Sequence, residues 1–155
     1  MTNCEEFISQ LANKYGRKRE SLLPIIHEVI NQYYFLSEES MTAIASELEM
    51  PTAEVYGTAT FYSFFDTKPQ GKYVIRVCQT IVCDMKRKED IVDAIYELLR
   101  IKPGEITANG KFSLYYTNCL GMCHEGPAML INDDQYAKLT PERVKDILAN
   151  YMKNS

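Results

Sequence analysis

Four of the chain's five cysteines form two short-spaced pairs, and each pair directly follows a segment that reads as a β-strand. Cys78 and Cys83 have four residues between them, whereas Cys119 and Cys123 have three. Loops at the ends of neighbouring strands share one edge of a sheet and hold exposed side chains on a rigid scaffold. We therefore expect the fold to present four thiolates together at one sheet edge.

The first part of the chain predicts helices throughout. Apolar residues recur there at helical spacing, and short connections between the segments predict a small bundle. Ser21 and Ser40 are expected to cap the second and third helices, because a serine hydroxyl accepts hydrogen bonds from the free N–H groups of a first turn. The predicted helical segments cover residues 3–15, 21–34, 40–50 and 51–65.

A turn at residues 66–72, with its proline and glycine, separates this part from one of different character. The pattern beyond it predicts a strand, a helix, a second strand, a hairpin and a closing helix with Thr140 as its cap. These segments cover residues 72–78, 87–101, 111–119, 128–139 and 140–151. We predict an α+β protein, with an N-terminal helical bundle at residues 1–68 and an α/β domain at residues 72–155.

Composition and the N-terminal sequence place the chain among globular proteins that do not enter a membrane. Hydrophobic residues make up 46% and charged residues 25%, which is typical of a soluble domain. No apolar run is long enough to span a bilayer, and "MTNCEEFISQ" lacks the plan of a secretory signal. We expect a cytoplasmic location, where structural disulfides are disfavoured, so paired cysteines indicate metal binding or redox work.

The charge distribution argues against nucleic-acid binding. Residues 1–70 carry five basic against ten acidic side chains, and residues 71–155 carry twelve against eleven, without the basic excess of a nucleic-acid binder. Residues 51–65 follow the rhythm of a helix-turn-helix, but Glu54 is their only charged residue. Their aromatic residues are expected mainly to fill a core, with a share forming a partner surface: Tyr56, Phe61, Tyr62, Phe64 and Phe65.

Three interpretations of the cysteine pairs compete. Free cysteines are often buried as small apolar residues, but two short-spaced pairs argue against that explanation. Structural zinc favours four cysteines at such spacings and stays open. A [2Fe–2S] cluster has two irons, each taking two terminal thiolates, and two separated pairs match that shape. A redox dithiol would use one pair only, and no C-x-x-C motif is present.

The sequence around these cysteines is similar to the thioredoxin-like [2Fe–2S] ferredoxin family. The similarity lies in "CLGMCHEGPAMLIND" with C-x4-C upstream, and in "MPTAEVYGTATFYSFF" with its Val-Tyr-Gly and Thr-Phe-Tyr. It extends from about residue 5 to residue 152. Family members include the small peripheral subunit of respiratory complex I and corresponding subunits of NAD(P)-linked hydrogenases and formate dehydrogenases.

The resemblance implies that residues 72–155 form a thioredoxin-like domain in which Cys78, Cys83, Cys119 and Cys123 bind one [2Fe–2S] cluster. It implies an electron-transfer subunit of an NAD(P)H-linked oxidoreductase complex, with no catalytic substrate site of its own. The implied partners are a subunit that carries flavin (FMN) and exchanges hydride with NAD(P)H, and a hydrogenase or formate dehydrogenase catalytic subunit. No G-x-G-x-x-G follows a strand here, so NAD(P) is expected on another chain. The alternative is a zinc-stabilised interaction or regulatory module.

The first cysteine loop departs from the pattern of many relatives, which carry a small residue or glycine between the cysteines and an Arg-Gly soon after. Here residues 79–82 are Gln-Thr-Ile-Val, and residues 84–87 are Asp-Met-Lys-Arg. The ligand spacing is intact, so the expected ligand set is unchanged. We expect the difference to act on the hydrogen bonds to sulfur, the reduction potential and the docking surface.

Three further features have simpler interpretations. His124 follows Cys123 directly, but a Rieske centre needs two histidines, and His27 belongs to the helical part. His124 is therefore expected to be a loop residue near the site. Cys4 is expected to be a bystander in a frayed N-terminus. Lys86–Lys88 is expected to be a solvated start of a helix, and the alternative is that this run meets an acidic partner or offsets the charge of the cluster.

Overall fold

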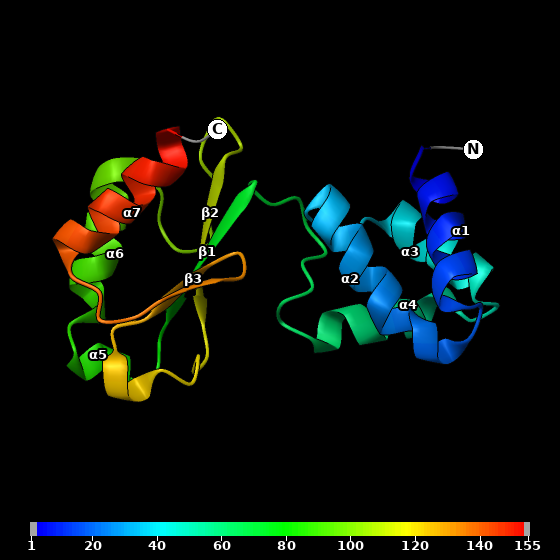
Figure 1. Cartoon of the computed structure of the whole chain (residues 1–155), viewed down its shortest axis with the longest axis horizontal. Coiled ribbons are helices and arrows are strands. Elements are labelled where there is room, and N and C mark those ends of the chain that lie inside the picture. The colour runs from blue at the N-terminus through cyan, green and yellow to red at the C-terminus, as the bar shows by residue number, and fades with distance from the viewer. Residues whose placement is uncertain (1–2, 154–155) are drawn as a thin grey trace. The chain divides into compact units, whose positions relative to one another are not determined.

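The computed structural model describes residues 3–153, and the chain divides after Pro69 into two compact units. The first unit is helical (Figure 1). Its helices are α1 (Asn3–Tyr15), η1 (Arg19–Ser21, a 3-10 turn), α2 (Leu22–Tyr33), α3 (Glu38–Glu47) and α4 (Thr52–Phe61). Their apolar stripes meet in one core, to which α1 contributes Ile8, α2 contributes Ile26 and α3 contributes Ile44. The predicted helical bundle is thus present in residues 3–69.

The caps of two helices differ from the prediction. Ser21 does precede α2, but its hydroxyl donates to the Tyr15 carbonyl oxygen at 2.8 Å and makes no cap hydrogen bond. Ser37, rather than Ser40, caps α3, because its Oγ accepts from the Ser40 N–H at 3.1 Å. Ser40 lies inside the helix and is buried. Two serines three residues apart both fit the cap preference, so the sequence did not distinguish them.

The aromatic segment that includes α4 is more exposed than predicted. Phe65 is buried and Tyr62 packs against the core, but Tyr56, Phe61 and Phe64 are exposed by 54%, 78% and 54%. Only Val55 and Ala59 of α4 are buried. A short helix with aromatic residues on several faces can direct only some of them inward, so the expectation of a mainly core function for them was wrong.

The second unit is a mixed four-stranded sheet with helices (Figure 1). In chain order its elements are β1 (Tyr73–Cys78), α5 (Ile81–Met85), α6 (Lys88–Leu99), β2 (Phe112–Thr117), η2 (Cys123–Glu125, a 3-10 turn), β3 (Met129–Ile131), β4 (Asp134–Tyr136) and α7 (Pro141–Lys153). The strand order is β2-β1-β3-β4. Strand β1 pairs parallel with β2 and antiparallel with β3, and β3–β4 is the predicted hairpin. The α+β fold class is therefore confirmed.

Helices α6 and α7 pack side by side, and their apolar faces share a core with the sheet (Figure 1). Ile95 of α6, Leu148 of α7 and Ile75 of β1 are fully buried in that core. Thr140 caps α7 as predicted, since its Oγ1 accepts from the Arg143 N–H at 3.2 Å. Along residues 3–153, no helix has both the length and the apolar character needed to cross a membrane.

Candidate metal centre

The central strand of the sheet places the first cysteine. Cys78 is the last residue of β1, and its register partner is Thr117, the last residue of the parallel strand β2. Cys119 follows Thr117 by two residues, so both cysteine segments leave the sheet at the same edge. Parallel strands carry their chain in the same direction, which is why two pairs distant in sequence meet here.

The structure differs from the prediction in the form of the first loop. Cys83 lies on the short helix α5, not on an open loop, and Cys123 is the first residue of the turn η2. Each pair therefore has one cysteine at or just after a strand and one on a helical turn. A helical turn directs successive side chains to different sides, so Cys83 is buried while Ile81 and Met85 of the same helix are exposed.

The sulfur atoms meet in two pairs of unequal exposure. Cys78 and Cys83 are only 2% and 1% exposed, and their thiols hydrogen bond to each other. The Cys119 and Cys123 Sγ atoms are 3.2 Å apart, with Cys119 exposed and Cys123 half-buried. All four predicted cysteines are thus brought to one place, with a buried pair and an accessible pair.

Hydrogen-bond donors surround the sulfurs. The Thr80 Oγ1 lies 3.2 Å from the Cys78 Sγ, and the Gly121 N–H donates to the Cys119 Sγ at 3.4 Å. Backbone groups of Leu120 and Ala128 hydrogen bond to the Cys78 and Cys83 sulfurs. Donors directed at sulfur stabilise thiolate charge. The cysteine motifs alone did not indicate that the Thr80 hydroxyl takes part.

The acidity of the thiols follows these contacts. Burial acts to raise the pKa of the Cys78 thiol, but the Thr80 hydrogen bonds and those from Cys83 and Leu120 outweigh it and lower the pKa. Burial, together with the Cys78 hydrogen bond, raises the pKa of the Cys83 thiol. The pKa of Cys123 is raised by its hydrogen bond with Cys119 and by burial, with smaller electrostatic contributions from Cys119, Cys78 and Cys83. The two pairs therefore influence each other's charge.

Space beside the buried pair is kept free by a glycine. A Cβ atom on Gly126 would lie 3.1 Å from the Cys83 Sγ and 3.4 Å from the Lys86 Cδ. The φ and ψ angles of Gly126, −67° and 163°, suit any residue. Its lack of a side chain is therefore needed for close packing against Cys83 and not for backbone conformation.

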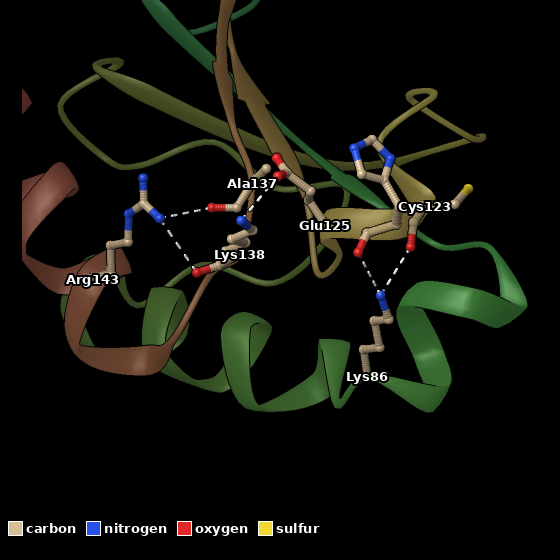
Figure 2. A network of polar contacts seen from close by, with 7 residues as sticks. Lys86, Cys123, Glu125, Ala137, Lys138 and Arg143 are labelled. Atoms are coloured by element: carbon tan, nitrogen blue, oxygen red, sulfur yellow. Dashed lines mark hydrogen bonds and ion pairs between the residues drawn. The ribbon is translucent and has the colours of Figure 1, made fainter.

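The basic run Lys86–Lys88 is not simply a solvated helix start. Lys86 donates to the carbonyl oxygens of Cys123 and His124 (Figure 2). Lys88 is 8% exposed, pairs with Asp84 and lies 5.1 Å above the Tyr116 ring. Lys86 is exposed but bonded to the second cysteine segment, and Lys88 is buried, which a charge run alone does not reveal.

The structure also shows where His124 and Cys4 lie. His124 lies on η2 and is exposed, beside the site as predicted. Cys4 belongs to the first unit, where it is part of α1 and its Sγ lies 3.2 Å from the Ser40 Oγ. Cys4 is thus helical and half-buried rather than frayed.

The donor set fits a thiolate-bound cluster. Two cysteine pairs, amide and hydroxyl donors directed at sulfur, and a glycine beside Cys83 are features that suit four-thiolate ligation of two irons. Among residues 3–153, no three or more His, Cys, Asp or Glu side chains are grouped as a single metal ion would require. Each iron of a [2Fe–2S] cluster takes only two terminal thiolates, so two separate cysteine pairs meet its need.

A sequence profile of the thioredoxin-like [2Fe-2S] ferredoxin family matches residues 8–152. The chain belongs to this family. The family identified from the cysteine motifs is therefore confirmed, and with it the [2Fe–2S] cluster that the family implies.

Proteins similar in sequence to this chain include subunits of NADH-quinone oxidoreductases and of a hydrogenase. It is 38% identical to an NADH-quinone oxidoreductase subunit of Aquifex aeolicus over 139 residues, covering 90% of this chain and 87% of that one. It is 36% identical to the NADP-reducing hydrogenase subunit HndA of Solidesulfovibrio fructosivorans over 146 residues, 94% and 83% of the two chains. An NADH-quinone oxidoreductase subunit of Escherichia coli K12 is 37% identical, with 94% and 88% covered.

The fold also resembles part of a solved hydrogenase. The NAD+-reducing [NiFe]-hydrogenase in its H2-reduced state matches with a TM-score of 0.76 at 23% identity. The match covers 86% of this chain and 22% of that chain, so the present chain spans about a fifth of its length. At this identity the likeness shows the fold alone.

Proposed function

We propose that this protein is the [2Fe–2S] electron-transfer subunit of a multisubunit NADH-quinone oxidoreductase or NAD(P)-reducing hydrogenase, with Cys78, Cys83, Cys119 and Cys123 as the cluster ligands. The convergence of these four thiols at one sheet edge carries the proposal. Membership of the ferredoxin family supports the cluster, and the names of the relatives support the kind of complex.

The residues of this chain hold and tune the site. Cys78 and Cys83 provide a buried pair, and Cys119 and Cys123 provide an accessible one. The Thr80 hydroxyl and the backbone donors stabilise charge on sulfur. The cluster, when bound, supplies one-electron transfer whose potential depends on such hydrogen bonds, on net charge and on exposure.

The expected partner is a flavin-carrying subunit that exchanges hydride with NAD(P)H. A one-electron carrier needs such a partner, because hydride chemistry moves electrons in pairs and a flavin can release them singly. A hydrogenase or formate dehydrogenase catalytic subunit would complete the assembly. Co-purification of the protein from its source, followed by mass spectrometry of its partners and flavin analysis, tests this part.

The cluster itself is tested by anaerobic reconstitution. We expect red-brown protein with about two iron and two acid-labile sulfide per chain, as a [2Fe–2S] cluster requires. Colourless protein that retains zinc alone would instead support the zinc-stabilised interaction module and overturn the proposal.

The ligand assignment is tested by a matched pair of cysteine variants. Cys119→Ser should lose or badly destabilise the cluster, whereas Cys4→Ser, in the first unit, should leave the visible spectrum unchanged. Equal effects of the two substitutions would show that the ligands are assigned wrongly.

A further inference from the structure

The side chain of Lys86 joins the two cysteine segments. Lys86 directly follows α5, which carries Cys83, and its Nζ donates to the carbonyl oxygens of Cys123 at 3.0 Å and His124 at 3.2 Å (Figure 2). Both acceptors belong to η2. One ammonium group therefore fastens the turn that carries Cys123 to the helix that carries Cys83.

The aliphatic part of Lys86 also packs at the site. The Cβ position of Gly126 lies 3.4 Å from the Lys86 Cδ and 3.1 Å from the Cys83 Sγ. The lysine stem and the buried ligand sulfur are thus neighbours across the glycine. The stem of Lys86 and the Cys83 Sγ therefore both border the space that the glycine leaves free.

Another cation, Lys138, is attached to η2 through Glu125, and Arg143 holds the segment that carries Lys138. Lys138 pairs with Glu125 at 3.0 Å, and Arg143 donates to the Ala137 carbonyl oxygen at 2.9 Å (Figure 2). Lys138 is therefore a cation attached to the same turn. It provides a control for loop attachment by a cation whose charge is already paired with a carboxylate.

The ammonium group of Lys86 is held by two neutral carbonyl oxygens, so these contacts leave its positive charge uncompensated. The neighbouring cations differ, because Arg87 pairs with Asp90, and Lys88 pairs with Asp84 and Glu89. A positive charge near thiolates favours the more negative, reduced form of a centre, and so raises its reduction potential.

We propose that Lys86 is a positioning residue of the cluster site, which clasps η2 to α5 and places a positive charge at the turn that carries Cys123. It thereby slows loss of the cluster and raises its reduction potential. This inference rests on the proposed function, because it takes the four cysteines as ligands.

The test uses the reconstituted chain of 155 residues and three variants, Lys86→Met, Lys86→Arg and Lys138→Met. Redox titration followed by visible spectroscopy should show that Lys86→Met lowers the equilibrium constant for reduction about tenfold, which is about 59 mV for one electron. Lys86→Met should also release iron to a chelator at least threefold faster. Lys86→Arg should restore most of both properties, and Lys138→Met should change the potential by less than half as much.

Two results of that titration would overturn the inference. One is that Lys86→Met has the same reduction potential and the same rate of iron release as the wild-type protein. The other is an equal shift in Lys138→Met, which would mean that any cation on this surface acts in the same way.

A second measurement needs no cluster. In the cluster-free chain at fixed pH, iodoacetamide labelling read by mass spectrometry should modify Cys83 at least threefold faster in Lys86→Met, with Cys4 as internal reference. Loss of a nearby positive charge would by itself slow the reaction of a thiol, so acceleration reports opening of the clasp. Unchanged Cys83 labelling would overturn the clasp. Failure of the wild-type chain to take up iron would contradict the proposed function, while this labelling would still decide whether Lys86 holds η2.

Discussion

Gly126 lies in a crowded place and Gly57 in an open one, so the same glycine-to-alanine substitution can be compared at the two positions. A methyl group at Gly126 would crowd the Cys83 Sγ and Lys86 Cδ, whereas a Cβ at Gly57 in α4 would meet nothing within 4 Å. The first position therefore depends on the absence of a side chain, and the second does not.

Gly126→Ala should destabilise the cluster-free second unit by about 1–2 kcal/mol, because extra atoms in a packed site force neighbours to move. It should also reduce iron retention after reconstitution. Gly57→Ala should stabilise the first unit by about 0.5–1 kcal/mol, since alanine is the better helix former. Urea unfolding and iron analysis provide the measurements, and equal effects at both positions would contradict the close approach.

The Thr80 hydroxyl gives a test of hydrogen bonding at a single ligand. Once Cys78 is a thiolate, the hydroxyl is the only possible donor in their 3.2 Å contact. Thr80→Val keeps the shape and removes the donor, so the reduction potential should fall; Thr80→Ser should keep it near the wild-type value. A potential measured in Thr80→Val that equals wild type would show that this contact does not tune the site.

Helix α3 shows which of two serines caps the start of a helix. Ser37 accepts the Ser40 N–H, whereas Ser40 is buried and contacts the Ser37 Oγ. Ser37→Ala should cost about 1 kcal/mol of unfolding free energy in the first unit, and Ser37→Gly only a few tenths, because glycine tolerates the cap position. Denaturant titration distinguishes the two, and a loss below about 0.3 kcal/mol for Ser37→Ala would show that the cap contributes little.

Elements long enough to show a period could be predicted from the sequence. Strand β1 falls within its predicted segment, and helix α7 follows the predicted cap Thr140 and runs two residues past the predicted end, to Lys153, because the apolar residues of both repeat over several positions. Helix α5 has only five residues, too few for a period, and so Cys83 was expected on a loop. The parallel pairing of β1 with β2 joins residues far apart in sequence, which no local pattern records.

In the candidate site too, local features could be predicted from the sequence and long-range contacts could not. The spacing of the cysteines indicated that they belong together, because each pair is local in sequence. Lys86 reaches carbonyl groups 37 and 38 residues away, and its partners follow only once α5 has turned the chain. Contacts to the ligands that depend on tertiary folding were therefore not predictable from the motifs.

The molecule as a whole has two separate hydrophobic cores, one in each compact unit. The four cysteines proposed as cluster ligands all belong to the second unit. A ligand that binds only the folded state stabilises the unit that contains its site, so the cluster should act unequally on the two cores.

Chelation of the cluster should therefore lower amide hydrogen-exchange protection in β1 and α6 and leave α2 and α3 unchanged. As a reciprocal control, Ile44→Ala should weaken the first unit by about 2–5 kcal/mol through the cavity it leaves, with protection of β1 retained. Equal loss of protection in both units on chelation would show that they unfold as one.

The uneven burial of the cysteine pairs has a consequence for damage and repair. Oxidation of cysteine depends on exposure as well as on thiolate character. The pKa of Cys78 is lowered, but its sulfur is buried. Exposure therefore decides the order, and oxygen-derived oxidants should attack Cys119 and Cys123 before Cys78 and Cys83. The buried pair is held by the central strand and by α5. A damaged protein would therefore keep half of its thiols intact, and reduction of the accessible pair alone would make it ready for reassembly.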